Sequence, residues 1–260
     1  MASPKHDSEQ PFKFPEARAV APGAPWTWLR HAWQDLRWAP AASLFYGAAF
    51  AAMGWLLRLA LGHGEYLLAL MTGFLLAGPF LAVGLYDLSR RRERGWAPRL
   101  APTLGAWRAN APALGFYAVI LALLLAAWIR VSVVVVALFF AGGMPDLGHL
   151  PEELLGNPEG LVFLAAYLAA GAGFALLVFA TSAVSIPMLL DREKMDALSA
   201  MIASFNAVRL NFGVMLVWAA AIVVITGLGM ALHYAGLVLA MPLVGHATWH
   251  AYRDAVAPEQ

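Results

Sequence analysis

Six long runs of almost exclusively apolar residues set the pattern of this chain. They cover residues 40–61, 66–88, 112–141, 160–190, 212–233 and 235–250. About 20 apolar residues in helical form cross a bilayer, and only helices or closed barrels satisfy the backbone in lipid. The runs lack the alternation of apolar and polar residues that barrel strands require. The pattern therefore predicts an all-α membrane protein with six transmembrane helices.

The composition excludes a water-soluble domain. Hydrophobic residues make up 61% of the 260 residues and charged residues 13%, against about 45–50% and about 25% in soluble proteins. The same apolar content excludes intrinsic disorder. Because the chain contains no cysteine, disulfides, thiolate metal sites and a cysteine nucleophile are excluded as well.

The basic residues are distributed unequally between the two sides of the predicted membrane. Of the 17 Lys and Arg residues, Arg58 and Arg130 lie within apolar runs, and all the others lie before the first run, after the second, after the fourth or in the C-terminal tail. The opposite loops contain none. Because cytoplasmic loops carry the excess of Lys and Arg, this alternation predicts that both termini are cytoplasmic.

The chain divides into a tail and a membrane domain. Residues 1–25 are rich in Pro, Ala and charge and are predicted to be a mobile cytoplasmic tail, followed by a six-span domain over residues 26–254. Within residues 25–38, apolar positions recur at three- and four-residue steps, which predicts an amphipathic helix lying in the membrane plane. Its interfacial anchors would be Trp26, Trp28, Trp33 and Trp38. Specific recognition of a lipid or partner is the alternative interpretation.

A weak threefold repeat accompanies the runs. Amphipathic segments at residues 104–112 and 197–211 precede the third and fifth runs, as residues 25–38 precede the first. Each returning run contains a proline, namely Pro79, Pro187 or Pro242. We therefore expect cytoplasmic in-plane helices, and the repeat adds the hypothesis of three related helical hairpins.

Arg130 is the candidate intramembrane polar site. Ionisable groups within a membrane are functional candidates by default, and Arg130 lies about 27 Å along its helix from Pro112, at 1.5 Å per residue. It would either tie two long helices together or bind an anion or lipid headgroup. No Asp or Glu lies in the middle of an apolar run, which argues against an ion-coupled carrier.

His246, His250 and Asp254 form the candidate ligand or metal site. The histidines are four residues apart and share a helical face, with Asp254 one turn further along. This spacing suits Zn, Cu or Fe. The alternative is that the histidines anchor a helix end at the interface, where they also suit the helix dipole. The sequence does not identify a cofactor. The simpler expectation is that the protein binds none, and the alternative is a metal ion or haem.

Several motifs of the chain are similar to a known family. They are residues 78–86, Ser89-Arg90, residues 185–192 and residues 242–254. Together they resemble a family of bacterial predicted integral membrane proteins that carries a domain-of-unknown-function label, over roughly residues 25–255. Its members are sometimes labelled as cytochrome c oxidase subunit I-like, but such a subunit is much longer and buries its ligating histidines deep in the bilayer. The resemblance implies the bacterial inner membrane and supplies no activity.

Three functions remain open at this stage. The chain contains no recognisable catalytic motif, so we expect that it is not an enzyme. A non-catalytic membrane scaffold or assembly partner fits best, contacting the lipid bilayer and possibly another membrane complex or itself, but no nucleic acid. The alternatives are a conduit for a small solute or lipid, and a haem- or metal-handling accessory protein that uses His246 and His250.

Overall fold

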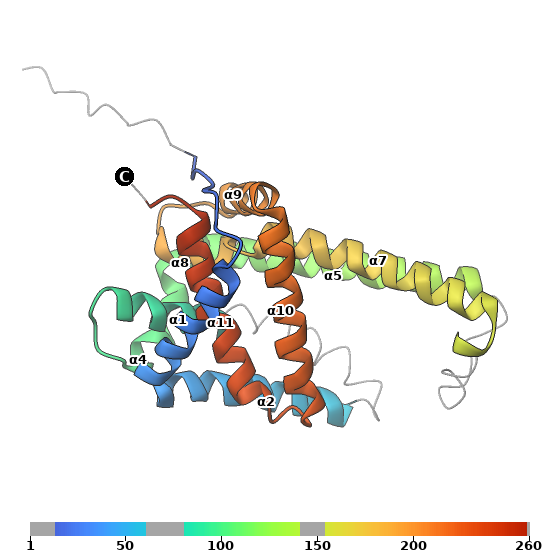
Figure 1. Ribbon diagram of the computed structural model, residues 1–260, viewed down its shortest axis with the longest axis horizontal. Helices are drawn as coiled ribbons and strands as arrows, with labels where there is room; N and C mark the ends of the chain where they lie inside the picture. The colour runs from blue at the N-terminus through green and yellow to red at the C-terminus, as the bar shows by residue number, and fades with distance from the viewer. Residues whose placement is uncertain (1–13, 61–80, 141–153, 259–260) are drawn as a thin grey trace, which may run out of the picture.

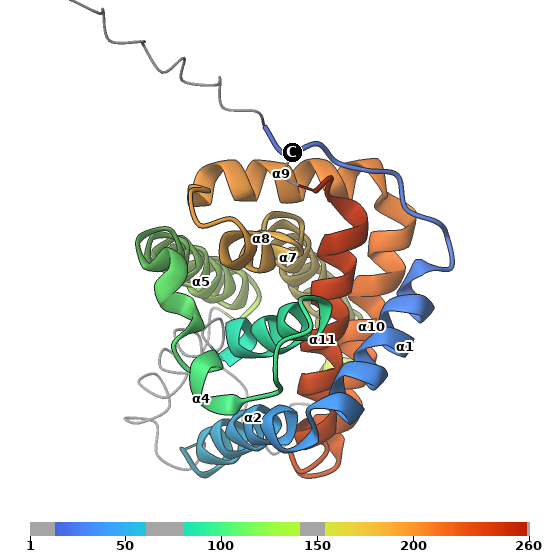
Figure 2. The same ribbon diagram turned by 90° about the vertical axis from the view of Figure 1, so that its left-hand side faces the viewer.

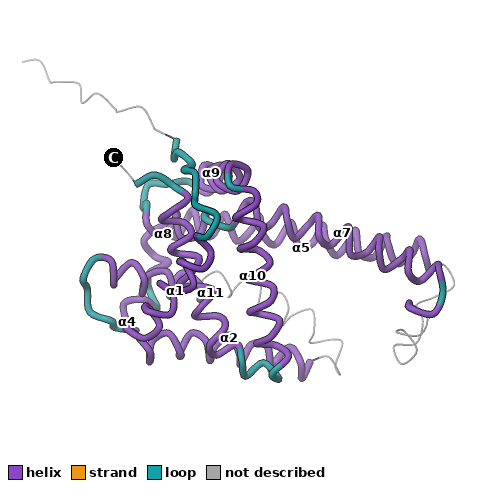
Figure 3. The backbone as a smooth tube through the Cα atoms, viewed as in Figure 1, coloured by secondary structure: helices purple, strands orange, loops and turns teal. Residues whose placement is uncertain are grey.

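The computed structural model describes residues 14–60, 81–140 and 154–258, and these residues form helices joined by short connections (Figures 1 and 3). The helices are α1 (Ala24–Trp38), α2 (Pro40–Ala60), α4 (Leu100–Thr103), the 3-10 helix η1 (Ala106–Asn110), α5 (Ala111–Phe139), α7 (Pro158–Ser182), α8 (Ser185–Asp191), α9 (Ala197–Leu210), α10 (Phe212–Ala231) and α11 (Leu237–Ala255). Residues 81–93 are helical as well. The described residues contain no strand.

Four helical stretches of the described chain are long and apolar enough to cross a membrane. They are Pro40–Leu59, Leu100–Phe139, Pro158–Asp191 and Phe212–Ala231, and they correspond to the first, third, fourth and fifth predicted spans. Most of the second predicted span lies outside the described residues. The sixth corresponds to α11, which is not among the four stretches. The structure therefore supports a membrane protein with several apolar helices, and six spans remain a prediction.

The helices α5 and α7 form a long antiparallel pair that projects from the rest of the molecule (Figure 1). Aromatic rings join the two helices: the centroid of Trp128 lies 5.4 Å from that of Tyr167 and 5.5 Å from that of Phe174. The hydroxyl groups of Ser132 and Tyr167 are 2.8 Å apart. Figure 2, which looks at the molecule from the opposite end, shows both helices receding behind α8.

Glycine allows α2 and α11 to approach each other closely. Pro242 lacks a backbone N–H, so it cannot donate to the carbonyl four residues earlier, at Val238. That carbonyl lies against Gly47 of α2, where a Cβ atom would be only 2.0 Å from the oxygen. The proline and the glycine are therefore paired across the helix contact, and any side chain at position 47 would separate the helices.

Two of the predicted in-plane segments form regular helices, and one does not. The helices α1 and α9 cover the predicted segments 25–38 and 197–211. The segment 104–112 instead forms the 3-10 helix η1 after the single turn of α4. Gly105 and the helix start set by Pro112 leave too few residues between them for a regular α-helix.

The structure describes residues 14–25 of the predicted mobile tail, and residues 1–13 lie outside the described residues. Residues 14–25 run against the C-terminal segment: Ala17 and Val256 form an antiparallel bridge, and the Ala257 amide donates to the Glu16 carbonyl at 2.9 Å. The Asn211 side chain accepts from the Val20 amide at 2.8 Å. This part of the tail therefore packs on the domain.

Candidate functional site

A buried polar cluster lies where α1, α2, residues 81–93 and α11 meet. We call its four central residues, Asp35, Ser43, Ser89 and His246, the polar hub. Each of them is at most 1% exposed. Buried polar groups are costly unless they are hydrogen-bonded, so the partners of these four residues decide what the hub is.

The pattern of α1 explains why a carboxylate is buried here. The buried face of α1 carries Ala24, Trp28, Ala32 and Asp35, at steps of three and four residues that place them along one side of the helix. The small residues of this stripe let α11 pack closely against α1. Asp35 continues the stripe and is therefore carried into the interface with the apolar residues.

The hub is a directed chain of hydrogen bonds. The Ser89 hydroxyl donates to Asp35 Oδ2 at 2.6 Å, so its oxygen is left to accept from His246 Nδ1, which is 2.8 Å away. His246 Nδ1 therefore carries a proton. In a neutral imidazole, Nε2 then accepts from the Ser43 hydroxyl at 2.9 Å. Both nitrogens of the ring are used, which fixes its tautomer and orientation.

Two further groups connect Asp35 to the surface of the molecule. Arg92 Nη1 donates to Asp35 Oδ1 at 2.6 Å, and His250 Nε2 is 2.8 Å from Asp35 Oδ2. The side chains of Arg92 and His250 are 34% and 15% exposed. The ring of His31 lies against that of His250, with centroids 5.1 Å apart. Asp35 is thus the point where the buried chain meets a polar rim.

These partners keep Asp35 ionised. The residue lies in α1, outside the four candidate spans. Burial acts to raise the pKa of its carboxyl group, because a charge is poorly solvated there. The hydrogen bond from His250 is the largest opposing effect, followed by the charge that His246 carries at acid pH, and together with the remaining partners they lower the pKa to about 2.

Ion pairs lie at the helix ends beside the hub. Asp87 accepts from Arg90 at 2.6 Å and from Arg91 at 2.8 Å. Asp191, at the end of α8, accepts from the Tyr252 hydroxyl at 2.9 Å. It also lies 3.3 Å from Arg253. Glu93, the last helical residue of 81–93, lies 3.3 Å from Arg253, and the following Arg94 lies 3.4 Å from Asp191. Residues 81–93, α8 and α11 therefore end beside one another, and charge holds their termini together.

The structure brings together two of the three predicted ligand residues. His246 and His250 both face Asp35, whereas Asp254 accepts a 2.7 Å hydrogen bond from the indole N–H of Trp28. In the part of the chain that the structure describes, no group of three or more His, Asp or Glu side chains is placed to hold a metal ion. Both ring nitrogens of His246, which would have to bind a metal ion, are already hydrogen-bonded to the hydroxyl groups of Ser43 and Ser89.

The four predicted tryptophan anchors occupy different environments. Trp26 is 72% exposed and Trp33 is 50% exposed, as an interfacial anchor requires, and Trp38 is partly exposed. Trp28 is fully buried, and its ring meets that of Trp218 edge to face at 5.7 Å. Trp28 is therefore part of the core rather than an interfacial anchor, because it shares the buried stripe of α1.

Arg130 lies on the exposed surface of α5. On the neighbouring α7, a Cβ on Gly171 would lie 3.3 Å from the ring of Trp128. Trp128 therefore occupies the notch that Gly171 opens.

Sequence reasoning missed Asp35, Ser43 and Ser89. The sequence pattern of residues 25–38 places Asp35 on the polar side of the helix, together with Arg30 and Arg37. The signal that could have identified it is the stripe of small and aromatic residues, Ala24, Trp28 and Ala32, which Asp35 continues. Ser43 and Ser89 carry no comparable signal, since their partners come from segments far away in the sequence.

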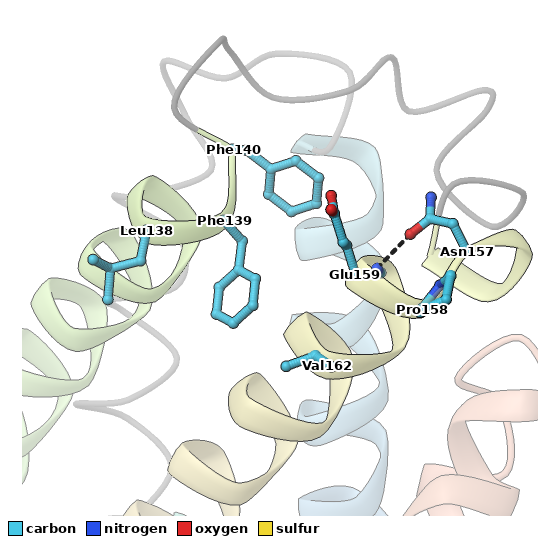
Figure 4. Close-up of a pocket in the computed structure, with 8 residues that line it drawn as sticks. Leu138, Phe139, Phe140, Asn157, Pro158, Glu159 and Val162 are labelled. Carbon is cyan, nitrogen blue, oxygen red and sulfur yellow. Dashed lines mark hydrogen bonds between the residues drawn. The ribbon is translucent and has the colours of Figure 1, made fainter.

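The hub is closed. The hollow drawn in Figure 4, of about 550 Å³, lies at the far end of the α5/α7 pair, where Asn157 caps α7 by accepting from the Gly160 amide at 2.6 Å. Two other hollows lie between the apolar helices, and none of the three is lined by a hub residue. The geometry is therefore that of a polar network that positions helices.

One comparison with known proteins gives a match. Residues 67–191 match the model of a family described as predicted integral membrane protein (DUF2189). No curated protein and no solved structure matches the chain. The matched stretch contains Ser89 and Arg92 but neither Asp35 nor His246. The chain is thus similar, over this stretch, to a family of membrane proteins whose function is unknown, in agreement with its apolar helices.

Proposed function

We propose that this chain is a non-catalytic membrane scaffold or assembly partner, in which the α5/α7 pair contacts another membrane helix. One observation carries the proposal. In the most apolar 18-residue window of each stretch, no residue is buried in Leu100–Phe139, and 6% of the residues are buried in Pro158–Asp191. The buried share is 39% in Pro40–Leu59. The pair therefore leaves much of its apolar surface uncovered by the rest of the described chain.

The length of the pair supports this role. The 29 residues of α5 extend about 43 Å at 1.5 Å per residue, whereas the hydrocarbon core is about 30 Å thick. Large apolar side chains remain exposed along the whole length, among them Leu123, Val133 and Leu138 at 65%, 63% and 74%. A helix pair that only crossed the bilayer would not need this length.

The base of the pair is built for rigidity. Asn110, directly before α5, donates its side-chain amide to the Met195 carbonyl at 2.8 Å and to the Leu189 carbonyl at 3.2 Å. This fixes the start of α5 to the loop that follows α8. The polar hub and the ion pairs fix the ends of the other helices. The α5/α7 pair is therefore anchored on a rigid part of the molecule when it contacts a partner.

The charge distribution supports a bacterial inner-membrane protein with both termini in the cytoplasm. The two ends of the described chain lie side by side at the basic loops: Ala17 pairs with Val256, the Arg192 guanidinium donates to the Ala257 carbonyl, and Arg94 lies 3.4 Å from Asp191. This end is opposite the far end of α5 and α7 (Figure 1). Basic residues are retained on the cytoplasmic side.

Site-specific photo-crosslinking in native membranes tests the proposal. A photoreactive residue at Val133 of α5 is compared with one at Val224 of α10, which has the same side chain and is 57% exposed. We expect a discrete protein adduct from position 133 and lipid adducts alone from position 224. The adduct's mass distinguishes a second copy from another protein. Lipid adducts alone from both positions would overturn the proposal.

A further inference from the structure

A second apolar hollow opens between α7, α9 and α10. Its volume is about 310 Å³, at the lower end of the roughly 300–1,000 Å³ typical of small-molecule sites. The lining residues are apolar with one exception: Leu176, Leu177, Phe179, Ala180, Phe205, Val208, Phe212, Leu216 and Ala219, with Arg209 as the exception. We call this hollow the α9 groove.

Arg209 places a positive charge at the α9 groove. It lies in the last turn of α9, and its side chain is exposed. The ion pairs found among the described residues use Arg90, Arg91, Arg92, Arg94 and Arg253, and none of them includes Arg209. Its guanidinium is therefore available to an anion that reaches the groove from outside.

An arginine in the last helical turn is also found in the other two segments that precede a candidate span. Arg37, Arg108 and Arg209 each lie in the last turn of α1, η1 and α9. Arg108 and Arg209 are each followed two residues later by an asparagine that precedes the next long helix. Of the three, only Arg209 lines one of the described hollows. Arg108 is therefore a matched control for a role that is specific to Arg209.

We propose that the α9 groove binds one anionic phospholipid, with an acyl chain between the apolar walls and the phosphate on Arg209. The walls come from α7 and α10, which belong to candidate spans, so the neighbouring molecules in a membrane are lipids. The exposed side of α9 carries Leu198, Ile202 and Phe205, which suits a helix at the level of the headgroups. A guanidinium binds phosphate through paired N–H donors.

Native mass spectrometry of the detergent-purified protein tests this site by titration with phosphatidylglycerol. A basic residue near the membrane surface contributes about 1 kcal/mol to the binding of anionic lipid, so Arg209→Gln is expected to weaken binding of the first lipid about five-fold. Arg108→Gln should bind as the wild type does. Ala219→Phe, which fills the groove and leaves Arg209 in place, should also lose the lipid, and circular dichroism checks that each variant is folded.

Three results would overturn the proposal. Equal weakening by Arg209→Gln and Arg108→Gln would show general attraction to basic residues, without a site. Undiminished binding in folded Ala219→Phe would show that the groove takes no acyl chain. Displacement of the lipid by inorganic phosphate alone would show that the phosphate, rather than a phospholipid, is the ligand. Because the titration is made on the purified protein, none of these results depends on whether the α5/α7 pair has a protein partner in the membrane.

Discussion

Asp35 receives hydrogen bonds from side chains that are more than 50 positions away in the sequence. Ser89 and Arg92 approach it from residues 81–93, and His250 approaches from α11. An isolated buried carboxylate would be strongly unfavourable, so Asp35 is tolerated only because these partners converge on it. Sequence reasoning identified the two histidines because their spacing is local, and missed Asp35 because its partners are not.

Replacing Ser89 with alanine is predicted to destabilise the protein. The hydroxyl accepts from His246 and donates to Asp35, so its loss leaves two buried polar atoms without this partner. Each such loss costs about 1–3 kcal/mol, and the thermal unfolding midpoint in detergent should fall clearly. Ser199→Ala serves as the control, since Ser199 lies in the first turn of α9 and its contact with Asp196 is exposed to solvent. Equal midpoints for the two variants would contradict a structural role for the hub.

Asp35 also predicts an acid-dependent loss of stability. The pKa of its carboxyl group is about 2 in the folded protein, below the ordinary value of 3.8. A lowered pKa stabilises the fold above the ordinary value, and this contribution of about 2 kcal/mol, at about 1.4 kcal/mol per pKa unit, is lost as the pH falls from 4 to 2. The unfolding midpoint of the wild type should therefore drop over this range. Asp35→Asn should start lower and change less, and parallel curves would count against the assignment.

At the scale of elements, the long apolar run before α11 and the two longer amphipathic segments correspond closely to helices, whereas the shortest amphipathic segment does not. The fifth predicted span, residues 212–233, corresponds closely to α10 (Phe212–Ala231). The segment 104–112 was expected to resemble the other two in-plane helices, yet it forms a 3-10 helix. A long run tolerates errors at its ends, whereas a nine-residue segment is decided by single residues such as Gly105.

The contact between α2 and α11 gives a prediction at this scale. Gly47→Ala would place a methyl group 2.0 Å from the Val238 carbonyl oxygen, which is backbone and cannot rotate away. The two helices must separate, and the protein should be destabilised by about 1–3 kcal/mol, as for other overpacking substitutions. The measurement is the thermal midpoint in detergent.

Gly115→Ala on α5 is the matched control for this substitution. No atom lies within 4 Å of the position that its Cβ would occupy, and alanine favours a helix over glycine by up to about 1 kcal/mol. The control should be neutral or slightly stabilising. Should Gly47→Ala be as stable as Gly115→Ala, the close contact of α2 with α11 would be wrong.

At the scale of the whole molecule, a closed polar hub supports a long apolar helix pair. The sequence predicts the membrane class and the apolar helices because both follow from local composition. It does not predict that α1 and α11, from opposite ends of the domain, pack against each other, since neither helix carries a local sign of its partner. The buried position of Trp28 has the same origin.

The direction in which the α5/α7 pair crosses the membrane tests this account most directly. The chain contains no cysteine, so single cysteines can be introduced at Ala97, in the exposed basic loop, and at Gly156, exposed near the far end of the pair. Each variant is treated in intact bacterial spheroplasts with a maleimide that cannot cross membranes. We predict that Gly156→Cys is labelled at once and that Ala97→Cys is labelled only after permeabilisation. Labelling of both positions from the same side would contradict the account.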